Sequence, residues 1–207
     1  MVGPTPFKTE LVRTARSESE SLPGLCRGDK ELEDRIESYG RSIGIVNIAS
    51  FRQHYSAVFI SWCMRKAGAT EAEFPWRLNH SEYARFALQN AEHEEGIVRA
   101  RRIEVYAPQP GDIVHVSPDN GQVNFDRIRA GRYNSESGIV IHIAPGTALI
   151  VTGNQGTCGN VGAEELMLTD AGLLAQRAQN PFIAVIEVLK IAVKRPRRPS
   201  GNQRHRS

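Results

Sequence analysis

The sequence is poor in cysteine and has no long apolar run. Its 207 residues include three cysteines, Cys26, Cys63 and Cys158, and these form neither an even set nor a Cys-x-x-Cys pair. The spacing therefore indicates neither a disulfide framework nor a zinc site, and a reducing compartment is the simple expectation. No stretch reaches the ~18–20 apolar residues of a membrane span, and residues 1–8 lack the apolar core of a signal peptide. A protein made in the cytoplasm is expected, and any export to the cell envelope would be independent of a signal peptide.

Several motifs of enzymes are missing as well. There is no Gly-x-x-x-x-Gly-Lys-Ser/Thr, no His-Glu-x-x-His and no Gly-x-Ser-x-Gly, and the six histidines are scattered. We therefore expect no cofactor and no metal ion. Cys63 lies in an apolar stretch, which indicates a small core side chain rather than a nucleophile.

The composition is that of a globular domain, with 40% hydrophobic and 24% charged residues. The net charge of +3 comes from the C-terminus, because residues 193–207 contain six Lys/Arg and no acid. We expect a disordered tail there; contact with nucleic acid or an anionic surface is the alternative, and its affinity would fall steeply with salt. The predicted organisation is an N-terminal helix and loop at 1–28, one domain at 29–192 and the tail at 193–207.

The most informative stretch is the apolar run at residues 54–68. Ser56 stands at its start, where a hydroxyl can accept a backbone N–H at the N-terminus of a helix. Arg65 and Lys66 suit the negative C-terminal end of the helix dipole, and Gly68 can adopt the left-handed conformation that ends a helix. The pattern predicts a buried helix that begins with a hydroxyl group.

The remaining pattern places helices before strands. Asn79 followed by Glu82 resembles a capping box for one of these helices. With no alternation of strands and helices, the order predicts an α+β fold in which N-terminal helices pack on a small antiparallel sheet. Besides the run at 54–68, the expected helices are 6–20, 30–40 and 81–90. The expected strands are 113–116, 138–143, 148–152 and a central one at 182–193. Residues 91–102 are expected to be exposed, residues 117–137 to be irregular, and residues 166–178 to form a loop and a short helix.

Residues 55–68 resemble the central helix of papain-like bacterial amidases of the NlpC and CHAP type. In those proteins a pattern such as Trp-Cys-Ala-x-Phe-Val-Ser-x-x-x-Arg-x-Ala-Gly carries the catalytic cysteine, and here Ser56 takes that position. The stretch is more similar to the bacterial family known as domain of unknown function 2272, in which Trp-Ser-Ala-Ala-Phe-Ile-Ser-Trp is usual and which has tryptophan where this chain has Tyr55. The resemblance covers about residues 30–190, and the matching residues of the helix are Ala57, Phe59, Ser61, Arg65, Ala67 and Gly68.

The resemblance implies a papain-like fold with Ser56 as the nucleophile. The family's His-x-Gly-Ile-Val pattern, which supplies the base, falls on residues 136–140, so Glu136 takes the place of the histidine. A serine hydroxyl is hardly ionised near neutral pH, so a positioned base is indispensable, and His80 and His54 are the alternatives to Glu136. The group that orients the base is expected near Thr152 or Asn154. Four further residues are expected to line the cleft: His54, Tyr55, Trp76 and Asp112.

Three functions follow from these patterns. The first is a hydrolase of amide bonds, in particular those of peptidoglycan peptides. The second is a catalytically inactive papain-like domain whose cleft binds a peptide, a glycan or a protein partner. The third is a structural or assembly protein that retains only the fold.

Overall fold

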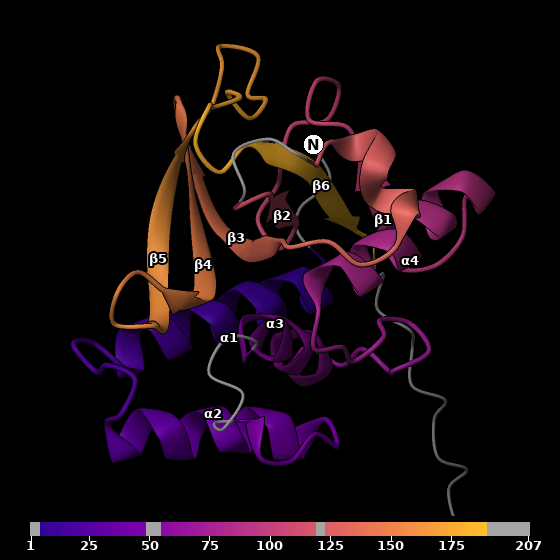
Figure 1. The fold of residues 1–207 in the computed structure, drawn as a ribbon. Helices are drawn as coiled ribbons and strands as arrows, with labels where there is room; N and C mark the ends of the chain where they lie inside the picture. The colour runs from indigo at the N-terminus through magenta and orange to yellow at the C-terminus, as the bar shows by residue number, and fades with distance from the viewer. Residues whose placement is uncertain (1–4, 49–54, 119–122, 190–207) are drawn as a thin grey trace, which may run out of the picture.

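The computed structural model describes residues 5–48, 55–118 and 123–189, and it has the predicted α+β architecture. Helices precede one six-stranded antiparallel sheet, as Figure 1 shows. The helices are α1 (Pro6–Ser21), α2 (Lys30–Ser42), α3 (Tyr55–Lys66), α4 (His80–His93) and the 3-10 helix η2 (Phe125–Ala130); the strands are β1 (Val98–Arg101), β2 (Ile113–Val116), β3 (Glu136–Ala144), β4 (Thr147–Gln155), β5 (Asn160–Met167) and β6 (Phe182–Val188).

The sheet has the strand order β1-β6-β2-β3-β4-β5, and all neighbours are antiparallel. The last strand, β6, inserts between β1 and β2, so its predicted central position is confirmed. Its apolar sequence suits this position, because both faces of β6 are covered and six of its seven residues are buried. The predicted hairpin of β3 and β4 is also present, with Ala144 paired to Thr147 at the turn.

The buried helix predicted around residues 54–68 is α3. All ten residues from Tyr55 to Met64 are buried, and α3 packs against α1, α2, β3 and β4. In Figure 1, α2 lies on the far side of α3 from the sheet, so α3 is enclosed between two layers. Gly68 ends the helix with a φ of 101°, in the predicted left-handed conformation.

The sheet divides the core into two parts. Ile139, Ile141 and Val151 face the helices and belong to the larger cluster. Val140 and Ile150 face the opposite side, where residues 168–174 cover them. The domain therefore buries both faces of the middle of its sheet, although helices cover only one of them.

Two strands, one 3-10 helix and one absent helix differ from the sequence-based prediction. Residues 91–102 were expected to be exposed, but β1 forms there, with Val98 and Ala100 buried and two arginines pointing outward. β5 was missed because the acidic pair Glu164 and Glu165 interrupts its apolar pattern. Residues 168–181 contain no helix, and the irregular region at 117–137 includes η2. Edge strands with charged outer residues give a weak periodic signal, which explains why β1 and β5 were not predicted.

The protein has one disulfide, which the spacing of its cysteines did not indicate. Cys26, in the loop after α1, forms a disulfide with Cys158 in the turn between β4 and β5, across 132 residues of sequence. The backbone brings the two loops together, since Arg27 N donates a 2.7 Å hydrogen bond to the carbonyl of Cys158. Sequence spacing carries no information about such a distant contact. Cys63 is fully buried, as predicted, and burial raises the pKa of its thiol.

Candidate functional site

A cleft of about 650 Å³ lies at the N-terminal ends of α3 and α4, and we call it the serine cleft. The residues at its walls come from four separate parts of the chain. All four predicted catalytic residues, Ser56, His80, Glu136 and Asn154, line it. The complete lining is Ser56, Leu78, Asn79, His80, Arg132, Tyr133, Asn134, Ser135, Glu136 and Asn154.

Ser56 lies in the first turn of α3 and is 5% exposed. Its Oγ has no hydrogen-bond partner among the described residues, so the prediction that it caps the helix is wrong. A second hydroxyl in this cleft, that of Ser135, is also buried and unpaired. A buried hydroxyl without a partner costs about 1–3 kcal/mol, so two of them in one cleft favour a site where a ligand supplies the missing hydrogen bonds.

The position of Ser56 depends on a close approach of β4 to α3. A Cβ atom on Gly153 would lie 3.2 Å from the Cα of Ser56 and 3.1 Å from the Cβ of Phe59. A larger residue would require its neighbours to shift by a few tenths of an ångström, so Gly153 favours the close approach of the end of β4 to the first turn of α3. This contact brings Asn154 to the wall of the serine cleft.

His80 begins α4 and is 6% exposed. Its Nδ1 is hydrogen-bonded to the hydroxyl of Tyr83, one turn further along the helix. The group that holds this imidazole nitrogen is therefore Tyr83, which the sequence did not indicate, whereas the orienting role was predicted for Asn154. Because Tyr83 is fully buried and burial raises the pKa of its phenol, the hydroxyl stays protonated.

A buried hydrogen-bond network extends from His80 under the serine cleft. Tyr83 also interacts with the hydroxyl of Ser137, and Ser137 Oγ lies 2.9 Å from Nδ1 of His115. Nε2 of His115 lies 3.0 Å from the hydroxyl of Tyr133, which lines the same cleft. The network therefore begins and ends at the cleft. His115 was missed because it lies within an apolar strand and belongs to no recognised motif.

The protonation states in this network are constrained by burial. Desolvation lowers the pKa of His115 to about 3, so its imidazole is neutral near pH 7. A neutral imidazole donates through one nitrogen and accepts at the other, while each hydroxyl can do both. The hydrogen bonds of the network can therefore all be donated in one direction along it, or all in the opposite direction. In one of these arrangements His80 donates through Nδ1 to Tyr83, which leaves Nε2 as the acceptor nitrogen that a general base requires.

Glu136 lines the serine cleft but is placed differently from Ser56. It is the first residue of β3 and is exposed. Strand alternation puts its side chain on the face of Val140, away from the helices. Desolvation and the nearby carboxylate of Glu164 both raise the pKa of Glu136. Its carboxyl group is therefore oriented toward the opposite face of the sheet from Ser56.

The other predicted cleft residues have different positions. Tyr55 is fully buried, and its hydroxyl donates a 2.7 Å hydrogen bond to the carbonyl of Gly159, which anchors the β4–β5 turn to α3. Trp76 packs against Phe74, with ring centroids 6.4 Å apart. Neither lines the serine cleft. His54 lies outside the described residues.

Asp112 also lies away from the serine cleft, at the junction of α1, β2 and β6. It has no exposed surface, and Lys8 Nζ lies 2.7 Å from its Oδ1. The hydroxyl of Tyr106 and the backbone N–H groups of Gln109 and Val188 donate to the same carboxylate at 2.9–3.0 Å. Burial raises the pKa of Asp112, and Lys8 opposes this effect. Its position therefore suits a structural role.

No group of three or more His, Cys, Asp or Glu side chains among the described residues could hold a metal ion. No helix of the described ranges is both long and apolar enough to cross a bilayer.

The fold and the site define an α+β domain with a buried serine and a histidine in one cleft. The sequence profile of a bacterial family, described as uncharacterized protein conserved in bacteria (DUF2272), matches residues 25–198. The chain therefore belongs to this family, as its resemblance at residues 55–68 predicted. No curated protein and no solved structure matches the chain. A relationship to the NlpC and CHAP amidases stays a prediction.

Proposed function

We propose that the chain hydrolyses amide bonds of a peptide, with Ser56 as the nucleophile and His80 as the base. One observation carries this proposal: the buried hydroxyl of Ser56 has no partner and lines the same cleft as His80. Ser56 stands at the N-terminal end of α3, where the positive end of the helix dipole favours developing negative charge. The resemblance of residues 55–68 to wall amidases makes peptidoglycan peptides the proposed substrates.

The reaction would proceed by acyl transfer. Ser56 Oγ attacks the carbonyl carbon of the amide while its proton passes to His80, and the carbonyl oxygen becomes an oxyanion near the N-terminus of α3. His80 then gives the proton to the leaving amine as the C–N bond breaks. Water hydrolyses the resulting ester, which releases the carboxylate product and restores the hydroxyl of Ser56. Asn154 would hold the peptide through its side-chain amide.

His80 suits the role of base better than Glu136 does. Tyr83 fixes the ring of His80, and the buried network provides the tautomer in which Nε2 accepts a proton. The carboxyl group of Glu136, in contrast, lies on the opposite face of the sheet from Ser56, near the carboxylate of Glu164. Hydrogen bonds between a nucleophile and its base commonly shorten only when substrate binds, so the unpaired Ser56 is compatible with this assignment.

A domain that binds a peptide without cleaving it is the second candidate. It is favoured by the absence of any hydrogen bond from Ser56 to a described basic group. In this case the unpaired hydroxyls of Ser56 and Ser135 would serve only to bind the backbone of the ligand. The substrate class of the two candidates is the same, and turnover separates them.

The disulfide supports a destination in the cell envelope. Disulfides persist in oxidising compartments and are rare in a reducing cytosol, so Cys26–Cys158 fits an exported protein better than a cytosolic one. Cell fractionation, with free thiols blocked before lysis, would test this destination. Recovery of the protein only from cytosol, with both cysteines reduced, would contradict it.

The test of the proposed function is digestion of purified peptidoglycan, with the released peptides identified by mass spectrometry. We expect the wild-type protein to cleave, Ser56→Ala and His80→Asn to be inactive, and Glu136→Gln to keep most of its activity. Ser135→Ala is the matched control, because it removes another buried, unpaired hydroxyl from the same cleft. Retention of peptide fragments by folded wild-type protein without cleavage would identify the binding domain instead.

A further inference from the structure

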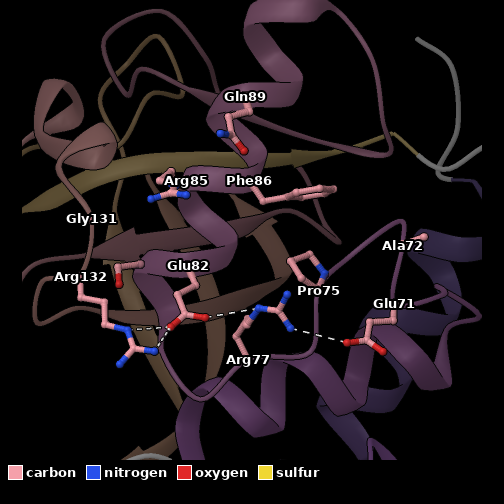
Figure 2. A pocket seen from close by; sticks show the side chains of 11 residues that line it. Glu71, Ala72, Pro75, Arg77, Glu82, Arg85, Phe86, Gln89, Gly131 and Arg132 are labelled. Atoms are coloured by element: carbon pink, nitrogen blue, oxygen red, sulfur yellow. Dashed lines mark hydrogen bonds and ion pairs between the residues drawn. The ribbon is translucent and has the colours of Figure 1, made fainter.

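A second cleft, of about 610 Å³, lies beside the serine cleft along α4, and we call it the arginine cleft (Figure 2). Arg132 lines both clefts, so the two are adjacent. Three arginines and two glutamates contribute to its walls, which leaves an excess of one positive charge. The lining residues are Glu71, Ala72, Pro75, Arg77, Ser81, Glu82, Arg85, Phe86, Gln89, Gly131 and Arg132.

The charged groups of the arginine cleft differ in their pairing. Glu82 holds two of the arginines, with Arg77 Nε 3.3 Å and Arg132 Nη2 2.7 Å from its carboxylate oxygens. Arg77 also lies 3.5 Å from Glu71, and Figure 2 shows its guanidinium group between the two carboxylates. Arg85 is exposed and forms no hydrogen bond or ion pair with a described residue. Its guanidinium group is the unneutralised charge of this cleft.

A second observation is independent of the arginines. Ser81, the second residue of α4, lines the arginine cleft, is 1% exposed, and its Oγ has no hydrogen-bond partner. Arg85 and Gln89 follow at intervals of four residues, which places all three on one face of the helix. The side chain of Asn79 does not cap α4 and instead donates to Glu82, so the predicted capping box is not formed. A row of hydrogen-bond donors thus leads away from the N-terminus of α4.

We propose that the arginine cleft binds a carboxylate of the peptide whose amide bond lies over Ser56. Arg85 would form a bidentate pair with the carboxylate, and the hydroxyl of Ser81 would donate to it. Glu82 would keep Arg132 oriented between the two clefts. The apolar surfaces of Pro75 and Phe86 would pack against the methylene groups of the acidic residue. The position of the amide rests on the proposed function, whereas binding of the carboxylate does not.

The charge of the cleft favours a carboxylate over a phosphate. Both ligands present oxygen atoms in a geometry that a guanidinium group can bind. The excess is a single positive charge, however, so a bound monoanion would leave the cleft neutral, whereas a bound dianion would leave an uncompensated negative charge. A peptide carboxylate matches the charge of one unpaired arginine.

The test is isothermal titration calorimetry of Ser56→Ala protein, which binds without turnover. The probes are N-acetyl-Ala-Glu-Ala with free carboxylates, the same peptide with every carboxylate amidated, and inorganic phosphate. We expect the free acid to bind about tenfold more tightly than the amide, and Arg85→Gln to abolish this difference. The control is Arg65→Gln, because Arg65 is an exposed arginine on α3 that forms no ion pair with a described residue. Ser81→Ala should weaken binding of the acid by a smaller factor.

Three results would overturn the inference. They are equal affinity for the two peptides, a preference for the acid that survives Arg85→Gln, and phosphate binding as tight as that of the acid with the same dependence on Arg85. Thermal unfolding of each variant confirms that the fold is intact. Binding that depends on Arg85, together with no peptidoglycan cleavage by wild-type protein, would refute the proposed hydrolase alone. Cleavage without a preference for the free acid would refute this inference alone.

Discussion

Two buried polar regions of this domain differ in how their hydrogen bonds are satisfied. At the junction of α1, β2 and β6, the carboxylate of Asp112 accepts from four donors. At the two clefts, the buried hydroxyls of Ser56, Ser81 and Ser135 have no partner. Folding alone explains the first region, since the donors connect α1, β6 and the segment that precedes β2. The second region leaves hydrogen bonds unmade where a ligand can enter, which is why the clefts, and not the Asp112 junction, are the candidate site.

The largest expected effect is the loss of the Asp112 carboxylate. Asp112→Ala removes the acceptor of four hydrogen bonds and leaves Lys8, whose side chain is 12% exposed, without its partner. We expect the free energy of unfolding to fall by about 3–5 kcal/mol, measured by urea denaturation. The control is Asp126→Ala, because the exposed pair of Asp126 with Arg102 should contribute less than about 1 kcal/mol. A loss below that of the control would show that the junction is not a structural centre.

The second effect is a loss of stability in acid caused by His115. The pKa of His115 is about 3 in the folded protein and about 6.5 when unfolded, so the unfolded state binds more protons between these values. Its contribution is therefore present above about pH 6.5 and is lost as the pH falls toward 3. We expect a decrease of about 3 kcal/mol between pH 7 and about pH 4.5, measured by urea denaturation. His115→Gln should make the pH profile flatter, and an unchanged profile would contradict the neutral, buried imidazole.

A smaller effect is expected from Tyr83→Phe, which interrupts the network between His80 and Ser137. Removal of this hydroxyl should reduce the free energy of unfolding by about 1–2 kcal/mol, because it leaves buried polar groups unpaired. If His80 is the base, turnover should fall more than peptide affinity, and the acidic limb of the pH–rate profile should shift. Tyr106→Phe is the control, since it removes a hydroxyl that donates a hydrogen bond to Asp112 and not to the network of His80. A change in stability alone would indicate that the network is only structural.

The smallest expected effect is the response of stability to removal of the unpaired hydroxyls. Ser56→Ala and Ser135→Ala remove no hydrogen bond from the described structure, so the free energy of unfolding should change by less than about 0.5 kcal/mol or increase. Ser137→Ala removes the hydroxyl next to His115 and should be clearly destabilising. Thermal unfolding compares the three variants. If all three variants lose the same amount of stability, the proposed difference between hydrogen-bonded and unpaired buried hydroxyls is wrong.

Local patterns predicted much of the fold. The apolar run of α3, the β3–β4 hairpin and the apolar β6 each have a strong periodic or turn signal, and each is present. The likeness to a known family at residues 55–68 and 136–156 selected Ser56, Glu136 and Asn154, and these three residues line one cleft. These predictions depend on residues that are close in sequence or on a motif with a fixed order.

The remaining features arise from contacts between distant parts of the chain. The pairing of Cys26 with Cys158, the network around His115 and the arginine cleft join elements whose separation in sequence carries no signal. The orientation of Glu136 could have been anticipated from strand alternation, had the start of β3 been placed at this residue. Short strands with charged outer faces, such as β1, stay difficult because their apolar residues are few.

The Cys26–Cys158 bond has a consequence for the order of events during synthesis. The two cysteines are 132 residues apart in the sequence, and Cys158 follows β4. The bond therefore cannot form until the ribosome has translated the chain past β4. Between the two cysteines lie α3, α4 and every residue of the serine cleft. When the disulfide forms, all residues of the serine cleft have therefore been synthesised and lie within the loop that the bond closes. If a protease cuts the chain once within this loop, the disulfide keeps the two fragments covalently joined.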